Sequence, residues 1–127
     1  MTTEGEPELE ELVRTIDAHP DPLHADFTPS VYALINRGVP GAHAVVHLLD
    51  APQRSTRVHA QRVLEAVVMR RHGWQAGRGY PDAQGEARTR AVLSDNGNYS
   101  ADDPPERRQA AIGQWRRWLD TQTEERA

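Results

Sequence analysis

This chain of 127 residues contains no cysteine, so disulfide bonds, thiolate metal sites and cysteine nucleophiles are excluded. It has no apolar run near the ~18 residues that a membrane-spanning helix needs. It also lacks a basic and then apolar leader at its start. From these absences we expect a soluble, cytoplasmic protein that does not enter a membrane.

Lysine is also absent, and all fifteen basic residues are arginine. We interpret this bias as the composition of a GC-rich bacterial genome rather than as selection for guanidinium chemistry. The charges are unevenly spread, because residues 1–26 carry eight acids against Arg14, whereas residues 51–80 carry six arginines against Glu65. Such asymmetry favours attraction between the two parts of the chain, or to partners of opposite charge.

No segment alternates apolar and polar residues with enrichment in β-branched side chains, which is the pattern of a half-buried strand. Hydrophobic residues make up 37% of the chain, and this low share favours a thin helical fold over a thick, sheet-centred one. The sequence therefore predicts a single all-α domain over residues 1–127, with residues 1–5 and 122–127 flexible.

Helical periodicity predicts four helices in the first part of the chain. Short breaks at prolines and at Gly38 separate them, so they should pack as antiparallel neighbours. The last of the four carries apolar residues on several sides, which predicts that it lies at the centre of the domain. The four expected helices cover residues 9–19, 29–38, 40–49 and 55–71.

Residues 73–105 are rich in glycine and other turn-forming residues, and we predict them as a loop-rich insertion before the C-terminal helix. Within them, residues 86–95 have the weak apolar pattern of a short helix. The C-terminal helix has a strong pattern, with Asp103 as its cap and Pro104 at its first position.

The segment PSVYALINRGVPGAHAVVHLLDAPQRSTRVHAQRVLEAVV, from Pro29 onwards, resembles HEAT-repeat proteins of the bacterial kind, which form armadillo-type α-α superhelices. The tail ERRQAAIGQWRRWL is similar to the closing helix of such proteins. The resemblance implies a binding scaffold without a fixed ligand, in which Arg57 makes polar contacts beneath the Asp50–Pro52 turn. A solenoid usually has three or more repeats, and the match spans about one and a half. We therefore expect a short HEAT-like array of antiparallel helices.

Three side chains of the third expected helix have the spacing of a metal half-site. His43, His47 and Asp50 follow the pattern HxxxHxxD, and positions i, i+4 and i+7 share one stripe of a helix. The pattern lacks the glutamate that makes the zinc motif HExxH specific. We interpret the three as residues of a solvated helix face, and we predict neither a metal nor a cofactor.

The arginines of the fourth helix indicate a surface for a partner. We expect Arg62, Arg70 and Arg71 to edge a groove between the third and fourth helices, with Trp74 and Tyr80 reaching it from the long loop. The serines and aspartates lack the context of a catalytic nucleophile or an acid–base pair. We therefore predict a non-enzymatic adaptor that binds another protein, a second copy of the chain included.

Nucleic acid is the alternative partner for the same residues. The arginines would contact phosphates while Trp74 and Tyr80 stack on bases. Against this alternative, the arginines point round the helix rather than along one stripe. The pI of about 5.8 is also far below that of a typical nucleic-acid-binding domain. Binding of a protein is therefore the leading hypothesis.

Overall fold

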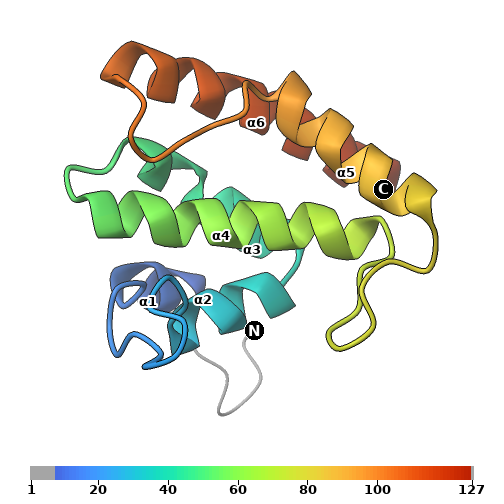
Figure 1. Ribbon diagram of the computed structural model, residues 1–127. Coiled ribbons are helices and arrows are strands. Elements are labelled where there is room, and N and C mark those ends of the chain that lie inside the picture. The colour runs from blue at the N-terminus through green and yellow to red at the C-terminus, as the bar shows by residue number, and fades with distance from the viewer. Residues whose placement is uncertain (1–7, 127) are drawn as a thin grey trace.

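The computed structural model describes residues 8–126, and it describes side chains up to Gln122. The described part of the chain is built from helices and contains no β-strand, so the predicted all-α class is confirmed (Figure 1). None of the described helices is long and apolar enough to cross a membrane. In chain order the elements are α1 (Leu9–Arg14), α2 (Pro29–Asn36), α3 (Val39–Val45), the 3₁₀-helix η1 (Val46–Asp50), α4 (Arg54–Arg71), α5 (Ala83–Asp95) and α6 (Pro105–Arg126).

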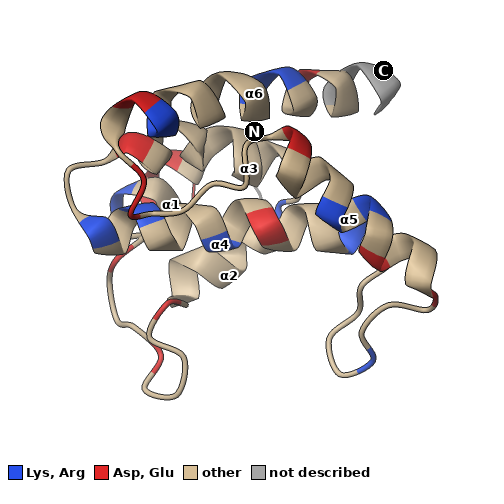
Figure 2. Ribbon diagram, turned by 45° about the horizontal axis from the view of Figure 1, so that its top comes forward, with Lys and Arg blue, Asp and Glu red and all other residues tan. Residues whose placement is uncertain are grey.

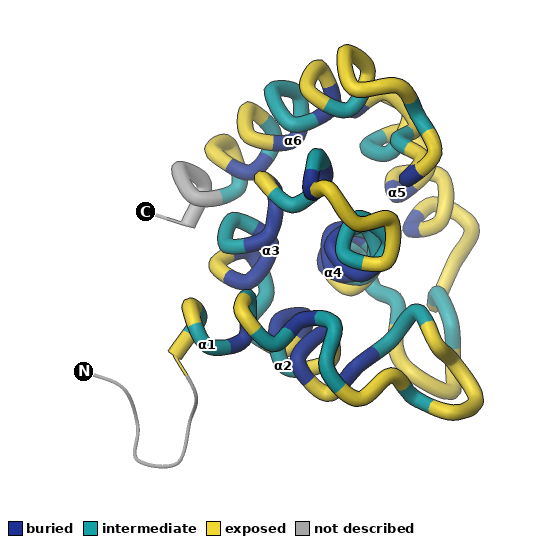
Figure 3. Tube along the Cα trace, turned by 90° about the vertical axis from the view of Figure 1, so that its left-hand side faces the viewer, coloured by how far each residue is buried: buried dark blue, intermediate teal, exposed yellow. Residues whose placement is uncertain are grey.

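Helix α4 lies at the centre of the molecule, as its apolar composition predicts. It contacts α2, α3, η1 and α5. In Figure 3, which looks nearly along α4, the other helices surround it. Burial of this helix on several sides forms the core of the fold. The apolar residues of α4 that face its neighbours are fully buried: Ala60, Val63, Leu64, Val67 and Val68.

The start of α2 is held by Thr28, which is fully buried. Its hydroxyl accepts the Val31 N–H at 3.0 Å as a helix cap and donates to the Ile16 carbonyl at 2.7 Å. Pro29 occupies the first helical position, where its missing N–H is not needed. The predicted start of this helix is confirmed, and the capping side chain also ties α2 to the end of α1.

Gly41 allows α2 and α3 to cross with their backbones in contact. A Cβ atom at this position would lie 2.0 Å from the Leu34 carbonyl oxygen, which is too close for any side chain. The chain passes from one helix to the other through Gly38, whose φ of +67° is rarely adopted by residues with a side chain. Two glycines therefore set the close packing of this helix pair.

Helix α1 is shorter than its sequence pattern predicts. It ends at Arg14 rather than several residues later. The hydroxyl of the next residue, Thr15, bonds to the Glu11 carbonyl at 2.8 Å and lies 2.7 Å from the Ser30 hydroxyl of α2. The chain therefore turns toward α2 at this point. The next apolar residue of the predicted stripe, Ile16, remains buried in the turn.

The third predicted helix changes character along its length. Its α-helical part, α3, ends at Val45, and the 3₁₀-helix η1 takes its place. Ala51 precedes Pro52 and takes the extended conformation that proline favours in its predecessor, with φ of −63° and ψ of 152°. A tight 3₁₀ turn is a common way for a helix to end, and here it keeps Leu49 fully buried.

The predicted loop-rich region, residues 73–105, contains a longer helix than expected. Helix α5 begins at Ala83, three residues before the predicted start, because the Asp82 carboxylate caps it by accepting the Gly85 N–H at 2.9 Å. Gly85 is buried, and a Cβ atom there would lie 2.3 Å from the His72 carbonyl oxygen. This glycine therefore brings α5 against the end of α4.

Helix α6 packs over α3 and η1. It begins at Pro105, one residue after the predicted start, and the Asp103 carboxylate accepts the Ser100 N–H of the preceding turn at 2.9 Å. The structure describes α6 as far as residue 126, so mobility of residues 122–127 stays a prediction, and residues 1–5 lie outside the described residues. The predicted apolar face is most deeply buried at Ala111, Trp115 and Leu119.

We expect Gly41→Ala to destabilise the fold by roughly 1–3 kcal/mol, because the added methyl group meets a backbone carbonyl. Gly113→Ala is the matched control, since a Cβ atom at that position of α6 would lie 3.7 Å from the Arg117 side chain, an ordinary contact. The control should stabilise the protein by about 0.5–1 kcal/mol. Urea unfolding followed by circular dichroism measures both. Equal midpoints for the two variants would contradict the backbone crossing.

Candidate partner-binding surface

Arg57 has a structural role near the start of α4. Its guanidinium donates to the carbonyls of Ala51 at 2.8 Å and Pro52 at 3.1 Å, beneath the turn that precedes the helix. A further hydrogen bond reaches the Ala101 carbonyl at 2.9 Å. The polar contacts that the HEAT resemblance implies for this residue are therefore present.

Arg62, one of the predicted contact residues, is neutralised within the molecule. Its Nε bonds to Asp26 Oδ2 at 2.5 Å and its Nη1 to Glu65 Oε1 at 2.8 Å. Burial opposes the charge of Arg62, but the hydrogen bonds and charges of the two carboxylates outweigh burial and raise its pKa. The hydrogen bond from Arg62 lowers the pKa of Asp26. Arg62 therefore fastens the loop before α2 to α4.

Arg70 and Arg71 lie at the C-terminal end of α4, beside a groove of about 330 Å³. Both are exposed, and Arg70 Nη1 donates to the Asn36 carboxamide oxygen at 2.7 Å. The ends of α2 and α4 and the start of α3 form the groove, and Arg62 does not line it. The lining residues are Ile35, Asn36, Gly38, Val39, Val67, Arg70 and Arg71.

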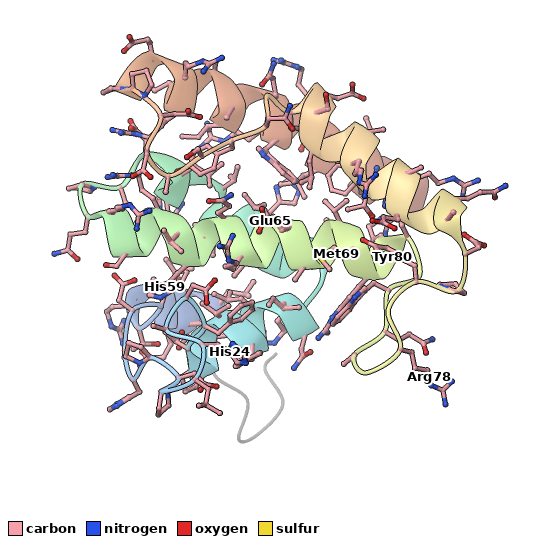
Figure 4. All side chains as sticks on the ribbon, viewed as in Figure 1. His24, His59, Glu65, Met69, Arg78 and Tyr80 are labelled. Carbon is pink, nitrogen blue, oxygen red and sulfur yellow. The ribbon has the colours of Figure 1, made fainter. Side chains whose placement is uncertain are left out.

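Trp74 and Tyr80 stand at the two ends of the loop after α4. Trp74 is half-buried and donates its backbone N–H to the Met69 carbonyl at 3.0 Å. Tyr80 lies near the end of α4 and donates its hydroxyl to Thr89 Oγ1 of α5 at 3.0 Å (Figure 4). Tyr80 therefore secures α5, whereas Arg78 is exposed and projects from the tip of the loop (Figure 4).

The end of α4 meets α5 in a cluster of positive charge. Burial lowers the pKa of His72, and the guanidinium groups of Arg88 and Arg71 lower it further. The His72 Nδ1 lies 3.4 Å from the Thr89 hydroxyl. Arg88 could not be predicted as part of this surface, because the apolar pattern of its helix is weak and nothing local in the sequence shows that this helix packs against α4.

We call residues 70–90 the basic end of the molecule. Figure 2 shows arginines on α5 and on the loop before it. The acidic residues of the basic end are Asp82 and Glu86, and Glu86 accepts a hydrogen bond from Arg90 at 2.6 Å. Against these two carboxylates the basic end carries five arginines: Arg70, Arg71, Arg78, Arg88 and Arg90.

The three candidate metal ligands do not come together. His47 is exposed, and His43 Nε2 lies 3.9 Å from the Asp120 carboxylate. Asp50 accepts a hydrogen bond from Arg108 at 2.8 Å, and this bond lowers the pKa of Asp50. The 3₁₀-helix η1 also interrupts the single α-helical stripe that the HxxxHxxD spacing assumes. Within the described residues, no three His, Asp or Glu side chains are arranged to hold a metal ion.

His59 is a buried polar residue that joins α4 to the segment between α1 and α2 (Figure 4). Its Nδ1 lies 2.5 Å from Asp17 Oδ1, and its Nε2 lies 3.3 Å from the Ala25 carbonyl oxygen. Thr56 donates to the other carboxylate oxygen of Asp17 at 2.5 Å. His59 therefore bridges α4 and the segment between α1 and α2.

The arrangement at the basic end can hold a carboxylate-bearing segment. Guanidinium groups give paired, charge-assisted hydrogen bonds to carboxylates and phosphates, and the apolar groove beside them can take an aliphatic side chain. Comparisons of the chain with protein-family models, with curated proteins and with solved structures found no match. The assignment of a function therefore rests on the geometry and the charge of this surface.

We expect Arg57→Ala to lower the free energy of unfolding by about 1.5–3 kcal/mol, because three backbone carbonyls lose a charged donor. Arg54→Ala is the matched control. Arg54 forms an exposed ion pair with Asp102 at 2.7 Å, and exposed pairs contribute little to stability. Urea unfolding of both variants tests the difference. If Arg57→Ala lowers the free energy of unfolding no more than the control does, Arg57 does not have this structural role.

The folded protein favours the neutral form of His72, and this determines the sign of its pH effect. Because the folded-state pKa lies below the ordinary value of 6.5, the unfolded chain binds more protons as the pH falls through that range. The stability from neutral His72 is present above this pH and is lost as the pH falls through the folded-state pKa.

We expect the free energy of unfolding to fall when the pH is lowered from about 7.5 to about 5.5. The fall should be larger for the native chain than for His72→Asn, which lacks the titrating group. Unfolding in urea at the two pH values, with both proteins in the same buffers, provides the measurement. An identical drop in the two proteins would show that His72 does not contribute.

Proposed function

We propose that the protein is a non-enzymatic adaptor that binds an acidic segment of another protein at its basic end. The setting of Arg70 carries this proposal. Arg62 and Arg108 each bond to a carboxylate. Arg70 instead bonds to the neutral carboxamide of Asn36, at the edge of an apolar groove. The described hydrogen bond of Arg70 is therefore to a neutral group, and a carboxylate of a partner would balance its positive charge.

The groove and its rim together define the chemistry of the partner. Ile35 and Val39 on the groove floor are 3% and 4% exposed, so the floor is apolar and nearly closed to water. Arg70 and Arg71 stand at the rim, and Arg78 is exposed on the neighbouring loop. A segment in which carboxylates flank one aliphatic side chain fits both parts, with the apolar anchor buried and the charges around it.

The HEAT resemblance supports the same proposal. The α2–α3 pair followed by α4 after a short Asp/Pro turn keeps the element order that the resemblance implies, and Arg57 contacts the carbonyls of that turn. HEAT-like modules bind proteins, and occasionally nucleic acid, on helical surfaces. We therefore propose a short HEAT-like array that acts in the cytoplasm, with a second copy of the chain as one of the partners to be tested.

A nucleic-acid backbone is the second candidate for the basic end, because arginines bind phosphates as well as carboxylates. The excess of five arginines over two carboxylates favours it. Against it, Arg57 and Arg62 are engaged inside the molecule, and the Tyr80 hydroxyl is bonded to Thr89. Fewer of the groups needed for phosphates and bases are thus available, and a protein partner ranks first.

The proposal is tested by titrating the full chain into a fluorescently labelled peptide in which glutamates flank single leucines. We expect Arg70→Glu/Arg71→Glu to weaken binding about tenfold or more, because the rim then repels the peptide. Arg116→Glu/Arg117→Glu is the matched control, since it makes the same change in net charge at exposed positions of α6. Fluorescence anisotropy should show a loss of less than about threefold for the control.

A labelled DNA duplex of arbitrary sequence, titrated at several salt concentrations, forms the second arm of the experiment. Strong DNA binding without peptide binding would replace the proposal with the nucleic-acid alternative. Equal losses of peptide affinity in the two double variants would show that net charge alone matters, and the basic end would no longer be a site.

A further inference from the structure

A second pocket, which we call the acceptor-lined pocket, lies between α4, α5 and α6 and has a volume of about 120 Å³. Its apolar walls belong to the core, since Leu49, Leu64 and Trp115 are at most 3% exposed. Half-buried Leu93 of α5 completes them, and exposed Asn98 stands at the mouth. The pocket therefore reaches from solvent to the apolar core, and it is separate from the groove at the basic end.

The hydrogen-bond donors of Gln61 and Tyr99 in this pocket are already engaged within the molecule. Gln61 Nε2 donates to Glu65 Oε2 at 3.1 Å and to the Tyr99 carbonyl at 3.2 Å, so Gln61 offers a guest its oxygen. The Tyr99 hydroxyl donates to the Leu49 carbonyl at 2.7 Å, and burial raises the pKa of Tyr99 to about 12. The Tyr99 hydroxyl oxygen can therefore only accept a further hydrogen bond. A guest that meets Glu65, Gln61 and Tyr99 must bring donors.

The charge around Glu65 indicates that the guest is a cation. Figure 4 shows Glu65 on α4, and it lines the pocket together with residues of α5 and α6. The guanidinium of Arg62 lies between Glu65 at 2.8 Å and Asp26 at 2.5 Å, so one positive charge faces two carboxylates. A positively charged ligand group beside Glu65 would balance the charge of this cluster. The same group would also lie near the acceptor atoms of Gln61 and Tyr99.

We propose that the acceptor-lined pocket binds a primary ammonium group carried by an apolar chain of about four carbons. An apolar cavity of ~150 Å³ holds a benzene ring, so the volume of about 120 Å³ suits a slightly smaller body. The ammonium has three donors for the acceptors of Glu65, Gln61 and Tyr99. Butylammonium and a lysine side chain share this chemistry. Because this chain contains no lysine, a lysine side chain would come from a different protein.

The probe is n-butylammonium chloride, with 1-butanol and butyrate as probes of equal chain length. Nuclear magnetic resonance of the full chain follows the indole N–H of Trp115, which lines the pocket. We expect butylammonium to shift this resonance with a Kd on the order of 1 mM. 1-Butanol should bind at least about fivefold more weakly than butylammonium. Butyrate should give no saturable shift, because its carboxylate can only accept hydrogen bonds and would face the acceptors of Glu65, Gln61 and Tyr99.

Two variants test the assignment of the head group and of the chain. Glu65→Gln should weaken butylammonium binding about tenfold, whereas Glu86→Gln removes the same charge from an exposed position of α5 and should leave binding unchanged. Leu93→Phe keeps Glu65 and fills the pocket, so it should abolish the shift. Equal affinities for butylammonium and 1-butanol, or a shift that survives in Leu93→Phe, would overturn the proposal.

Titration of Nα-acetyl-lysine methylamide in parallel separates the two sources of the ammonium. Tighter binding than that of butylammonium assigns the pocket to a lysine of a partner protein, and weaker binding assigns it to a free alkylamine. Absence of saturable binding by both overturns the proposal. Arg70→Glu/Arg71→Glu does not touch this pocket, so failure here and failure of the acidic-segment proposal are separate results.

Discussion

The fold depends on covering α4 on several sides. Besides its buried stripe, α4 carries the partly buried apolar residues Val58, Ala66 and Met69 on other sides, so no single neighbour can cover it, and α2, α3, η1 and α5 pack around the helix. The packing requires close approach of backbones at two places. Gly41 and Gly85 provide it, because neighbouring carbonyl oxygens leave no room for a methyl group there. Two glycines that contribute no apolar side chain thus decide how the helices meet.

The same arrangement divides the arginines of α4 into two groups. Where the helix is covered, Arg57 and Arg62 bond to carbonyls and carboxylates of the covering segments, because a charge that loses water needs polar partners. At the C-terminal end of the helix, Arg70 and Arg71 are exposed beside the groove. The run of arginines in the sequence therefore serves structure in its first part, and in its last part it edges the proposed binding groove.

The two proposed sites select guests of opposite charge. The basic end offers guanidinium donors around an apolar groove, so it suits carboxylates. In the acceptor-lined pocket, Gln61 and Tyr99 donate to internal acceptors and Glu65 contributes a carboxylate, so the pocket suits an ammonium group. Both sites combine an apolar surface, which supplies affinity, with a charged rim, which sets the sign of the guest.

Periodicity, proline and capping act over a few residues, so the sequence alone predicted the all-α class, the start of α2 at Pro29, the central α4 and the buried face of α6. It missed the early start of α5 at the Asp82 cap and the 3₁₀ character of η1. It also could not distinguish Arg62 from Arg70, because both are arginines of one helix. Their different settings come from Asp26 and Asn36, which are separated from them by 36 and 34 residues. Which arginine is neutralised depends on the tertiary structure, because distant parts of the chain bring to it the groups that balance its charge.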